Sequence, residues 1–210
     1  GDILVTNHPS AGGTHLPDIT VITPAFEGEE IIFYVASRAH HADIGGLLPG
    51  SMPPTSTELW QEGAAIFSEF LVRDGKFQEE TIIEKLLHEP SKHPGCSGTR
   101  RLSDNLSDLK AQIAANQKGI QLIALLVKEF GLATIDAYMK AIQDNAAETV
   151  TKMIDSLLEK NREKSLKCTD YMDDGSQISL SVYRDQESGK VIFDFEGTSA
   201  QSYNNFNAPS

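Results

Sequence analysis

The pattern of hydrophobic and polar positions predicts strands near the N-terminus. Short runs of β-branched and aromatic residues occur at 3–6, 19–23 and 31–37, and Gly, Pro and acidic residues separate them. Such runs favour strands over helices. Residues 26–29 predict a hairpin turn between the last two strands. The long stretches that follow the strands therefore become candidate functional loops.

The spacing of apolar residues changes to three and four positions in the middle of the chain. This spacing predicts one long helix over about 103–130 and a second over about 134–160. Because the link at Gly131 is short, we expect the two helices to form an antiparallel pair. Residues 57–70 can also share one helical face, although the end of that stretch could be a strand, and residues 81–88 predict a short helix.

Alternation of apolar and polar residues returns after position 177 and predicts a C-terminal β-hairpin. Together, these elements predict an α+β fold with mixed β-sheet segments and Gly-rich loops at the N-terminus, a helical pair and a hairpin. We expect a single fragment with a β/loop region over 1–100, the helical pair over 103–160 and the hairpin with a truncated end over 175–210. The chain opens inside a predicted strand, so we expect it to be a piece of a longer polypeptide.

Composition excludes several classes of protein. Eighteen Lys and Arg against 30 Asp and Glu give a net charge of −12, which argues against nucleic acid and anionic membranes as partners. We see no apolar run long enough to span a bilayer and no signal peptide. The two cysteines are too few for a disulfide framework, so we expect reduced thiols in a cytoplasmic protein.

Two Gly-containing loops carry the residues that favour metal chemistry. His15 and Asp18 lie three apart in the first loop, and His40 and His41 follow the third predicted strand. Adjacent residues of an extended segment point to opposite faces, so only one of these two imidazoles need face the first loop. Two imidazoles and a carboxylate suit Zn, Mn or Fe(II), which can activate a water or polarise a carbonyl. The second imidazole and Asp43 would then orient a ligand or take a proton.

Simpler interpretations exist for each of these residues. Asn, Asp and Gly build turns, and His is tolerated in loops, so both clusters could be structural. Glu62 follows the start of the helix predicted over 57–70, where it could be a fourth ligand, a base or a solvated capping residue. Cys96 lies in a flexible loop with no nearby activating base, which favours an inert thiol. The chain lacks a phosphate-binding Gly-x-x-x-x-Gly-Lys-Ser/Thr loop, so nucleotide binding by this chain alone is not supported.

Several segments together resemble the hydantoinase B/oxoprolinase family, and the resemblance extends over the whole chain. The most specific is His-His-Ala-Asp-Ile-Gly-Gly, and the full set lies at 7–18, 36–46, 49–53, 60–63, 105–119, 194–199 and 205–209. Within the family, the match is closest to the oxoprolinase branch. The resemblance implies that a hydantoinase A part binds ATP and phosphorylates a lactam, and that a hydantoinase B part with a metal centre assists its hydrolysis. In that branch, 5-oxo-L-proline is opened to L-glutamate.

Carried over by position, the resemblance places the metal ligands at His15, Asp18 and His40, with His41 as the alternative third ligand. We expect His41, Asp43 and Glu62 to act in catalysis. The implied partners are the lactam substrate, a hydantoinase A-type domain or subunit and further copies in a homo-oligomer, and the fragment is not expected to be active alone. Two alternatives remain: a hydantoinase or ketone carboxylase subunit, and a non-catalytic module in which the helical pair serves assembly.

Overall fold

The computed structural model describes residues 1–50, 52–161 and 165–207. The chain divides into two compact units, Gly1–Leu126 with Ser202–Ser210 and Val127–Gln201. Antiparallel sheets and helices occur in both, which confirms the predicted α+β class. None of the helices in the described part of the chain is long and apolar enough to cross a membrane.

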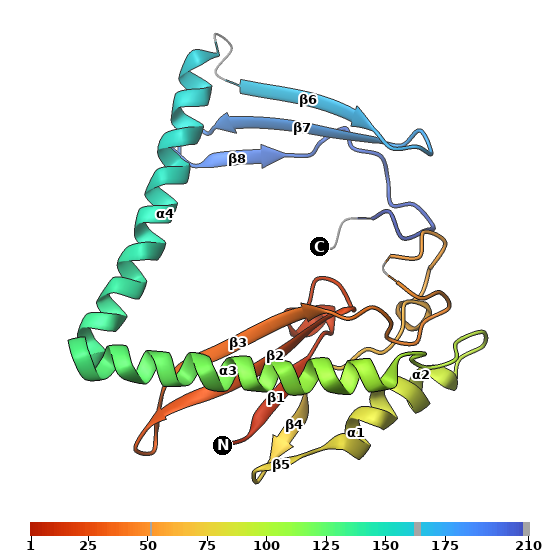
Figure 1. Ribbon diagram of the computed structural model, residues 1–210. Helices are drawn as coiled ribbons and strands as arrows, with labels where there is room; N and C mark the ends of the chain where they lie inside the picture. Colours follow the sequence, from red (N-terminus) through yellow and green to blue (C-terminus); the bar gives the residue numbers. More distant parts are fainter. Residues whose placement is uncertain (51, 162–164, 208–210) are drawn as a thin grey trace. The chain divides into compact units, whose positions relative to one another are not determined.

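The first unit contains a five-stranded sheet (Figure 1). Its order is β3-β2-β1-β4-β5, and the bounds are β1 (Ile3–Thr6), β2 (Asp18–Glu27), β3 (Glu30–His40), β4 (Glu69–Arg73) and β5 (Lys76–Phe77). The predicted hairpin is confirmed, with Gly28 in the turn between β2 and β3. β3 runs three residues beyond its predicted end, and it therefore carries His40 into the ladder.

Helical segments of the first unit are short until α3 begins. They are η1 (Pro9–Ala11), η2 (Leu59–Gln61), α1 (Glu79–Ile83), the π-helical η3 (Glu84–His88), α2 (Glu89–Ser91) and α3 (Leu102–Phe130), whose last residues belong to the second unit. A short helix at 81–88 is confirmed. A helix over the whole of 57–70 is wrong, whereas the alternative of a strand at the end of that stretch is confirmed by β4, which begins at Glu69. Gly63 stops the helix, because its φ of 129° and its bridge to Gly45 continue the chain in extended form.

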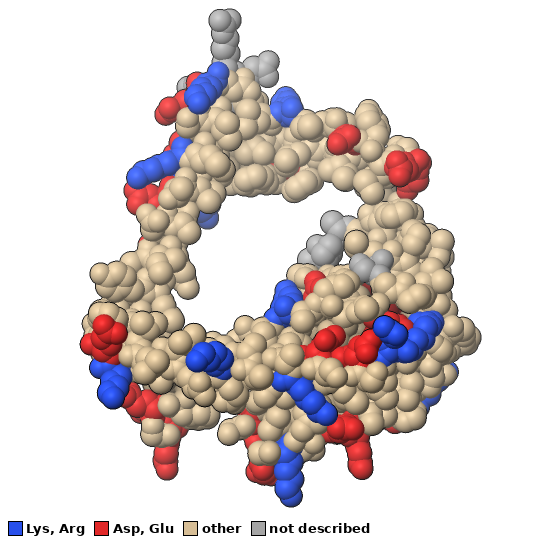
Figure 2. Space-filling view, in the orientation of Figure 1, with Lys and Arg blue, Asp and Glu red and all other residues tan. Residues whose placement is uncertain are grey.

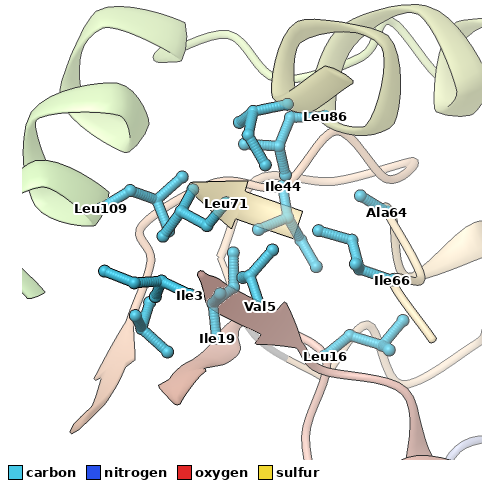
Figure 3. Packing of buried hydrophobic residues seen from close by; sticks show 12 residues of the cluster. Ile3, Val5, Leu16, Ile19, Ile44, Ala64, Ile66, Leu71, Leu86 and Leu109 are labelled. Carbon is cyan, nitrogen blue, oxygen red and sulfur yellow. The ribbon is translucent and has the colours of Figure 1, made fainter. Parts of the chain in front are cut away.

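The core of the first unit lies between the inner face of the sheet and the helices that cover it (Figure 3). Buried side chains come from the strands, from the 44–66 segment, from η3 and from α3, and they include Ile3, Val5, Ile19, Ile44, Ile66, Leu71, Leu86 and Leu109. Full burial of one such side chain stabilises the fold by about 1.5–3 kcal/mol. This packing fixes the sheet that carries the candidate site.

α3 lies across the inner face of the sheet and contacts it through amides as well as apolar groups (Figure 1). Gln112 donates its Nε2 hydrogens to the backbone carbonyls of Ile19 and Ser37, both at 3.0 Å. Asn116 donates in the same way to the carbonyl of Val21 at 3.0 Å. Because α3 covers this face, the opposite face of the β2–β3 ladder is left for a functional site.

The second unit joins a helix to a small sheet. Its elements are α4 (Leu132–Lys160), β6 (Ser165–Tyr171), β7 (Gln177–Arg184) and β8 (Val191–Asp194), with strand order β6-β7-β8. The two long helices and the β7–β8 hairpin are confirmed, whereas β6 was not expected. An ion pair between Arg184 and Asp155 ties β7 to α4. Antiparallel packing of α3 on α4 stays a prediction, as does the extent of the hairpin region over 208–210, which lies outside the described residues.

The surface carries both signs of charge despite the net charge of −12. On the face shown in Figure 2, acidic and basic side chains are interspersed along α3, and the basic ones form no continuous patch there. A nucleic-acid partner would favour such a patch.

Candidate active site

The outer face of the β2–β3 ladder brings Asp18 and His40 together. The two residues are register partners, Asp18 at the start of β2 and His40 at the end of β3. Asp18 Oδ1 lies 2.8 Å from His40 Nδ1, and the side chains are 28% and 49% exposed. A carboxylate and an imidazole thus meet where a ligand from solvent can reach them.

His15 joins this pair from the preceding loop. Its backbone carbonyl accepts a hydrogen bond from the amide of Asp18 at 2.9 Å, which closes a turn around Pro17. Its ring stacks on the ring of His40, with centroids 5.4 Å apart and an interplanar angle of 25°. The three residues expected as metal ligands therefore gather at one end of the ladder.

The donor set of this cluster fits a divalent metal, although its present arrangement does not enclose one. Within the described ranges, no group of three or more His, Cys, Asp or Glu side chains is arranged to hold a metal ion. Two donors bound to one Zn at 2.0–2.2 Å lie about 3.0–3.5 Å apart. The 2.8 Å contact of Asp18 with His40 is a few tenths of an ångström shorter and fits a direct hydrogen bond.

Asn7 holds the loop that carries His15. Its side chain is fully buried and donates to the carbonyls of Leu16 at 2.7 Å and Ala64 at 2.8 Å, while Oδ1 accepts from the amide of Ile66 at 2.6 Å. The loop passes so close that a Cβ at Gly13 would lie 2.1 Å from the Asn7 carbonyl oxygen. Sequence reasoning missed this role of Asn7, and its position directly after a strand was the available signal.

His41 lies on the opposite face of the ladder from His40 and is fully buried. Its Nδ1 lies 3.0 Å from Asn105 Nδ2, and its Nε2 lies 3.4 Å from Gln112 Oε1. Burial lowers the pKa of His41, and the hydrogen bond that His41 Nε2 donates to Gln112 Oε1 opposes that shift. With both ring nitrogens engaged by α3, His41 is held away from the Asp18–His40 pair.

Asp43 is buried, with 3% of its side chain exposed, and its carboxylate is fully engaged. It accepts hydrogen bonds from the amides of Gly45 and Arg100, both at 2.9 Å, and it pairs with the Arg100 guanidinium at 3.1 Å. These contacts tie the 43–46 segment to Arg100, two residues before α3 begins. This geometry fits an anchor for the loop.

Glu62 shares a cavity with His15. The cavity has a volume of about 320 Å³, and its lining includes Thr14, His15, Met52, Glu62, Asn205 and Asn207. Burial raises the pKa of Glu62 above its ordinary value of 4.5. A Cβ at Gly46 would lie 2.5 Å from the Glu62 backbone, so the Gly-Gly pair of the second loop lets that loop pack directly behind Glu62.

A second cavity of about 330 Å³ lies beside Trp60, whose ring stacks on His93 with centroids 4.9 Å apart. The thiol of Cys96 points toward the Trp60 carbonyl at 3.7 Å. Burial raises the pKa of this thiol, and a raised pKa disfavours the reactive thiolate. This environment fits the inert thiol expected from the sequence.

The fold and the residues clustered in its loops agree with one known family of proteins. The chain belongs to the hydantoinase B/oxoprolinase family, whose family model matches residues 1–210. This finding confirms the resemblance drawn from the motifs. Three of the motif residues, at 51, 208 and 209, lie outside the described residues.

The chain is also similar to particular members of this family. The chain is 60% identical over 210 residues to 5-oxoprolinase of Saccharomyces cerevisiae and 52% identical over 222 residues to 5-oxoprolinase 1 of Arabidopsis thaliana. Both alignments cover 100% of this chain, but only 16% and 18% of the relatives. The chain thus spans about a sixth of the length of these relatives.

Two solved structures share the fold. ATP-dependent caprolactamase from Pseudomonas jessenii matches with a TM-score of 0.70 and 23% identity, over 93% of this chain and 32% of that chain. Nucleotide-free acetone carboxylase matches with a TM-score of 0.66 and 21% identity, over 99% of this chain and 28% of that chain. At these identities the likeness concerns the fold alone.

Proposed function

We propose that this chain is the lactam-hydrolysing part of an ATP-dependent 5-oxoprolinase. The reaction consumes 5-oxo-L-proline, ATP and water and yields L-glutamate, ADP and phosphate. Relatives named 5-oxoprolinase, with 49–60% identity across the whole chain, support this substrate. ATP would be bound by a hydantoinase A-type part of the enzyme, and the complete enzyme would be a homo-oligomer.

The main support for this site is the contact between Asp18 and His40, with the His15 ring stacked on the His40 ring. We propose that these three residues hold a divalent cation, Zn, Mn or Fe. Such a cation, when bound, polarises a carbonyl and lowers the pKa of a bound water toward about 7. Proton transfer would be carried out by side chains of the surrounding loops.

Glu62 is the proposed group for proton transfer. A lactam carbonyl resists attack because of amide resonance, and phosphorylation of its oxygen removes that resonance. Water must then lose a proton as it attacks, and a carboxylate with a raised pKa is suited to accept it. Glu62 meets this need because it lines the same cavity as His15.

In this proposal, His41 and Asp43 hold the site residues in place and do not take part in the reaction themselves. His41 follows His40 directly and is held by α3, while Asp43 anchors the second loop to Arg100. Neither side chain lines the cavity that His15 and Glu62 share. Their loss would therefore disturb the geometry of the ligands.

Metal content and turnover of the full-length enzyme test the proposal. Elemental mass spectrometry on protein purified without chelators or a His-tag should find about one equivalent of Zn, Mn or Fe. Both metal and 5-oxo-L-proline-dependent ATP hydrolysis should be lost in His15→Ala and Asp18→Ala, and both should persist in the control His88→Ala, since His88 is exposed on η3.

Other outcomes would overturn parts of the proposal. Retained metal and turnover in both variants would remove the metal assignment. Turnover of hydantoins or ketones in place of 5-oxo-L-proline would indicate another activity of the family. Absence of metal and of every such turnover would favour an assembly module.

A further inference from the structure

Arg38 lies on the same outer face of the ladder as the candidate site. It is two residues before His40 on β3, and its register partner Thr20 is two residues after Asp18 on β2. Positions two apart on a strand share a face and lie about 7 Å apart. Arg38 is therefore the adjacent residue of β3 on the face that carries the Asp18–His40 pair.

Two neutral groups fix the guanidinium of Arg38. Its Nε donates to the Thr20 hydroxyl at 2.8 Å, and its Nη2 donates to the Gly12 carbonyl at 3.2 Å. Because Gly12 belongs to the loop that leads to His15, these bonds hold the guanidinium between that loop and the ladder. They orient its charge without neutralising it.

Arg38 differs from most arginines in the described ranges in having no carboxylate partner. Three others each pair with a carboxylate: Arg100 with Asp43, Arg101 with Asp104 and Arg184 with Asp155. No Asp or Glu of the described residues forms an ion pair with Arg38, and the side chain is exposed. An oriented, unneutralised guanidinium is suited to bind an oxyanion.

We propose that Arg38 binds an oxyanion of the substrate and thereby places the lactam at the Asp18–His40 pair. The inference rests on the proposed function, whose substrate carries a carboxylate next to the lactam ring. The favoured oxyanion is this carboxylate, which takes no part in ring opening and can serve as a fixed handle. The phosphoryl group transferred from ATP has the same chemistry and is the other source.

Substitution of Arg38 in the full-length enzyme separates these sources. The variants are Arg38→Gln and Arg38→Lys, and Arg73→Gln is the matched control because its guanidinium lies over the Phe70 ring, 4.9 Å from the centroid. The probes are 5-oxo-L-proline as substrate and 5-oxo-L-prolinamide, which lacks the carboxylate, as competing ligand. The readouts are KM, the inhibition constant of the amide and the ratio of ADP to glutamate formed.

For a bound carboxylate, Arg38→Gln should raise the KM for 5-oxo-L-proline by about 10- to 100-fold and leave the inhibition constant of the amide unchanged. Arg38→Lys should recover part of the loss. For a bound phosphoryl group, both constants should stay unchanged while ATP is cleaved without glutamate formation.

Unchanged KM and coupling in Arg38→Gln, or the same changes in Arg73→Gln, would overturn the inference. A wild-type enzyme without 5-oxo-L-proline-dependent ATP hydrolysis would instead contradict the proposed function. The assay of the wild-type enzyme thus separates failure of the proposed function from failure of the inference about Arg38 before any variant is compared.

Discussion

Asp18 Oδ1 and His40 Nδ1 lie 2.8 Å apart at the point where β2 begins and β3 ends. The pair is 28% and 49% exposed, and exposed pairs of this kind contribute about 0–1 kcal/mol to stability. His15 stacks on the same imidazole. The cluster therefore contributes little to the stability of the fold, and ligand binding explains its arrangement directly.

Replacement of Asp18 should separate stability from function. We expect Asp18→Asn to change the free energy of unfolding by less than about 1 kcal/mol, and to lower 5-oxo-L-proline turnover by about 100-fold or more. Urea denaturation and steady-state assays measure the two effects. Asp144→Asn, which removes the exposed partner of Lys140, is the control and should change neither. A stability loss that accounts for the lost turnover would contradict a ligand role.

The Asp43–Arg100 pair should behave in the opposite way. Asp43→Asn leaves Arg100 without its buried partner and removes the charge that two backbone amides donate to, so we expect a loss of about 2–4 kcal/mol. Arg100 is 34% exposed, so water offsets part of the cost of losing its partner. Chemical denaturation measures it, and Asp104→Asn, from the exposed pair with Arg101, should cost less than about 0.5 kcal/mol. Unchanged stability in Asp43→Asn would show that Asp43 is free for chemistry.

Burial of His41 predicts a dependence of stability on pH. Its pKa in the fold is lowered from the ordinary 6.5, so below pH 6.5 the unfolded chain takes up a proton that the folded chain does not. The unfolded state then binds more protons, and stability falls as pH drops below 6.5, by at most about 1.4 kcal/mol per pH unit. Unfolding at pH 7.5, 6.5 and 5.5 should show this loss in the wild type and a smaller one in His41→Gln. Identical slopes in both proteins would rule out His41 as the source.

Much of the fold was predictable because local pattern and burial agree. β1 is a short run of mostly β-branched residues and lies at the predicted positions, and α3 and α4 carry long runs with helical spacing. The 57–70 segment differs from the predicted helix. Its apolar residues suit a helical face, but Gly63 ends that conformation and Ile66 is buried outside any helix. Contacts that are distant in sequence decided this case.

The meeting of the candidate site residues was also predictable from the sequence. His15, Asp18 and His40 come together as expected, since two loops at the same end of a hairpin must meet. The supporting groups were not foreseen. Asn7 forms hydrogen bonds to residues that are 57 and 59 positions away in the chain, and Gln112 to one that is 93 positions away. No local spacing encodes such pairs.

The raised pKa of Glu62 leads to a test of its chemical role. If Glu62 accepts a proton from water, turnover requires its ionised form, so kcat should fall as pH drops through the raised pKa, above the ordinary 4.5. Glu62→Gln should lower kcat by about 100- to 10,000-fold and leave residual turnover without this acidic limb. Glu58→Gln, from the nearby capping box at η2, is the matched control and should keep both kcat and the limb. An acidic limb that survives in Glu62→Gln would assign the proton transfer to another group, because no titrating carboxyl remains at position 62.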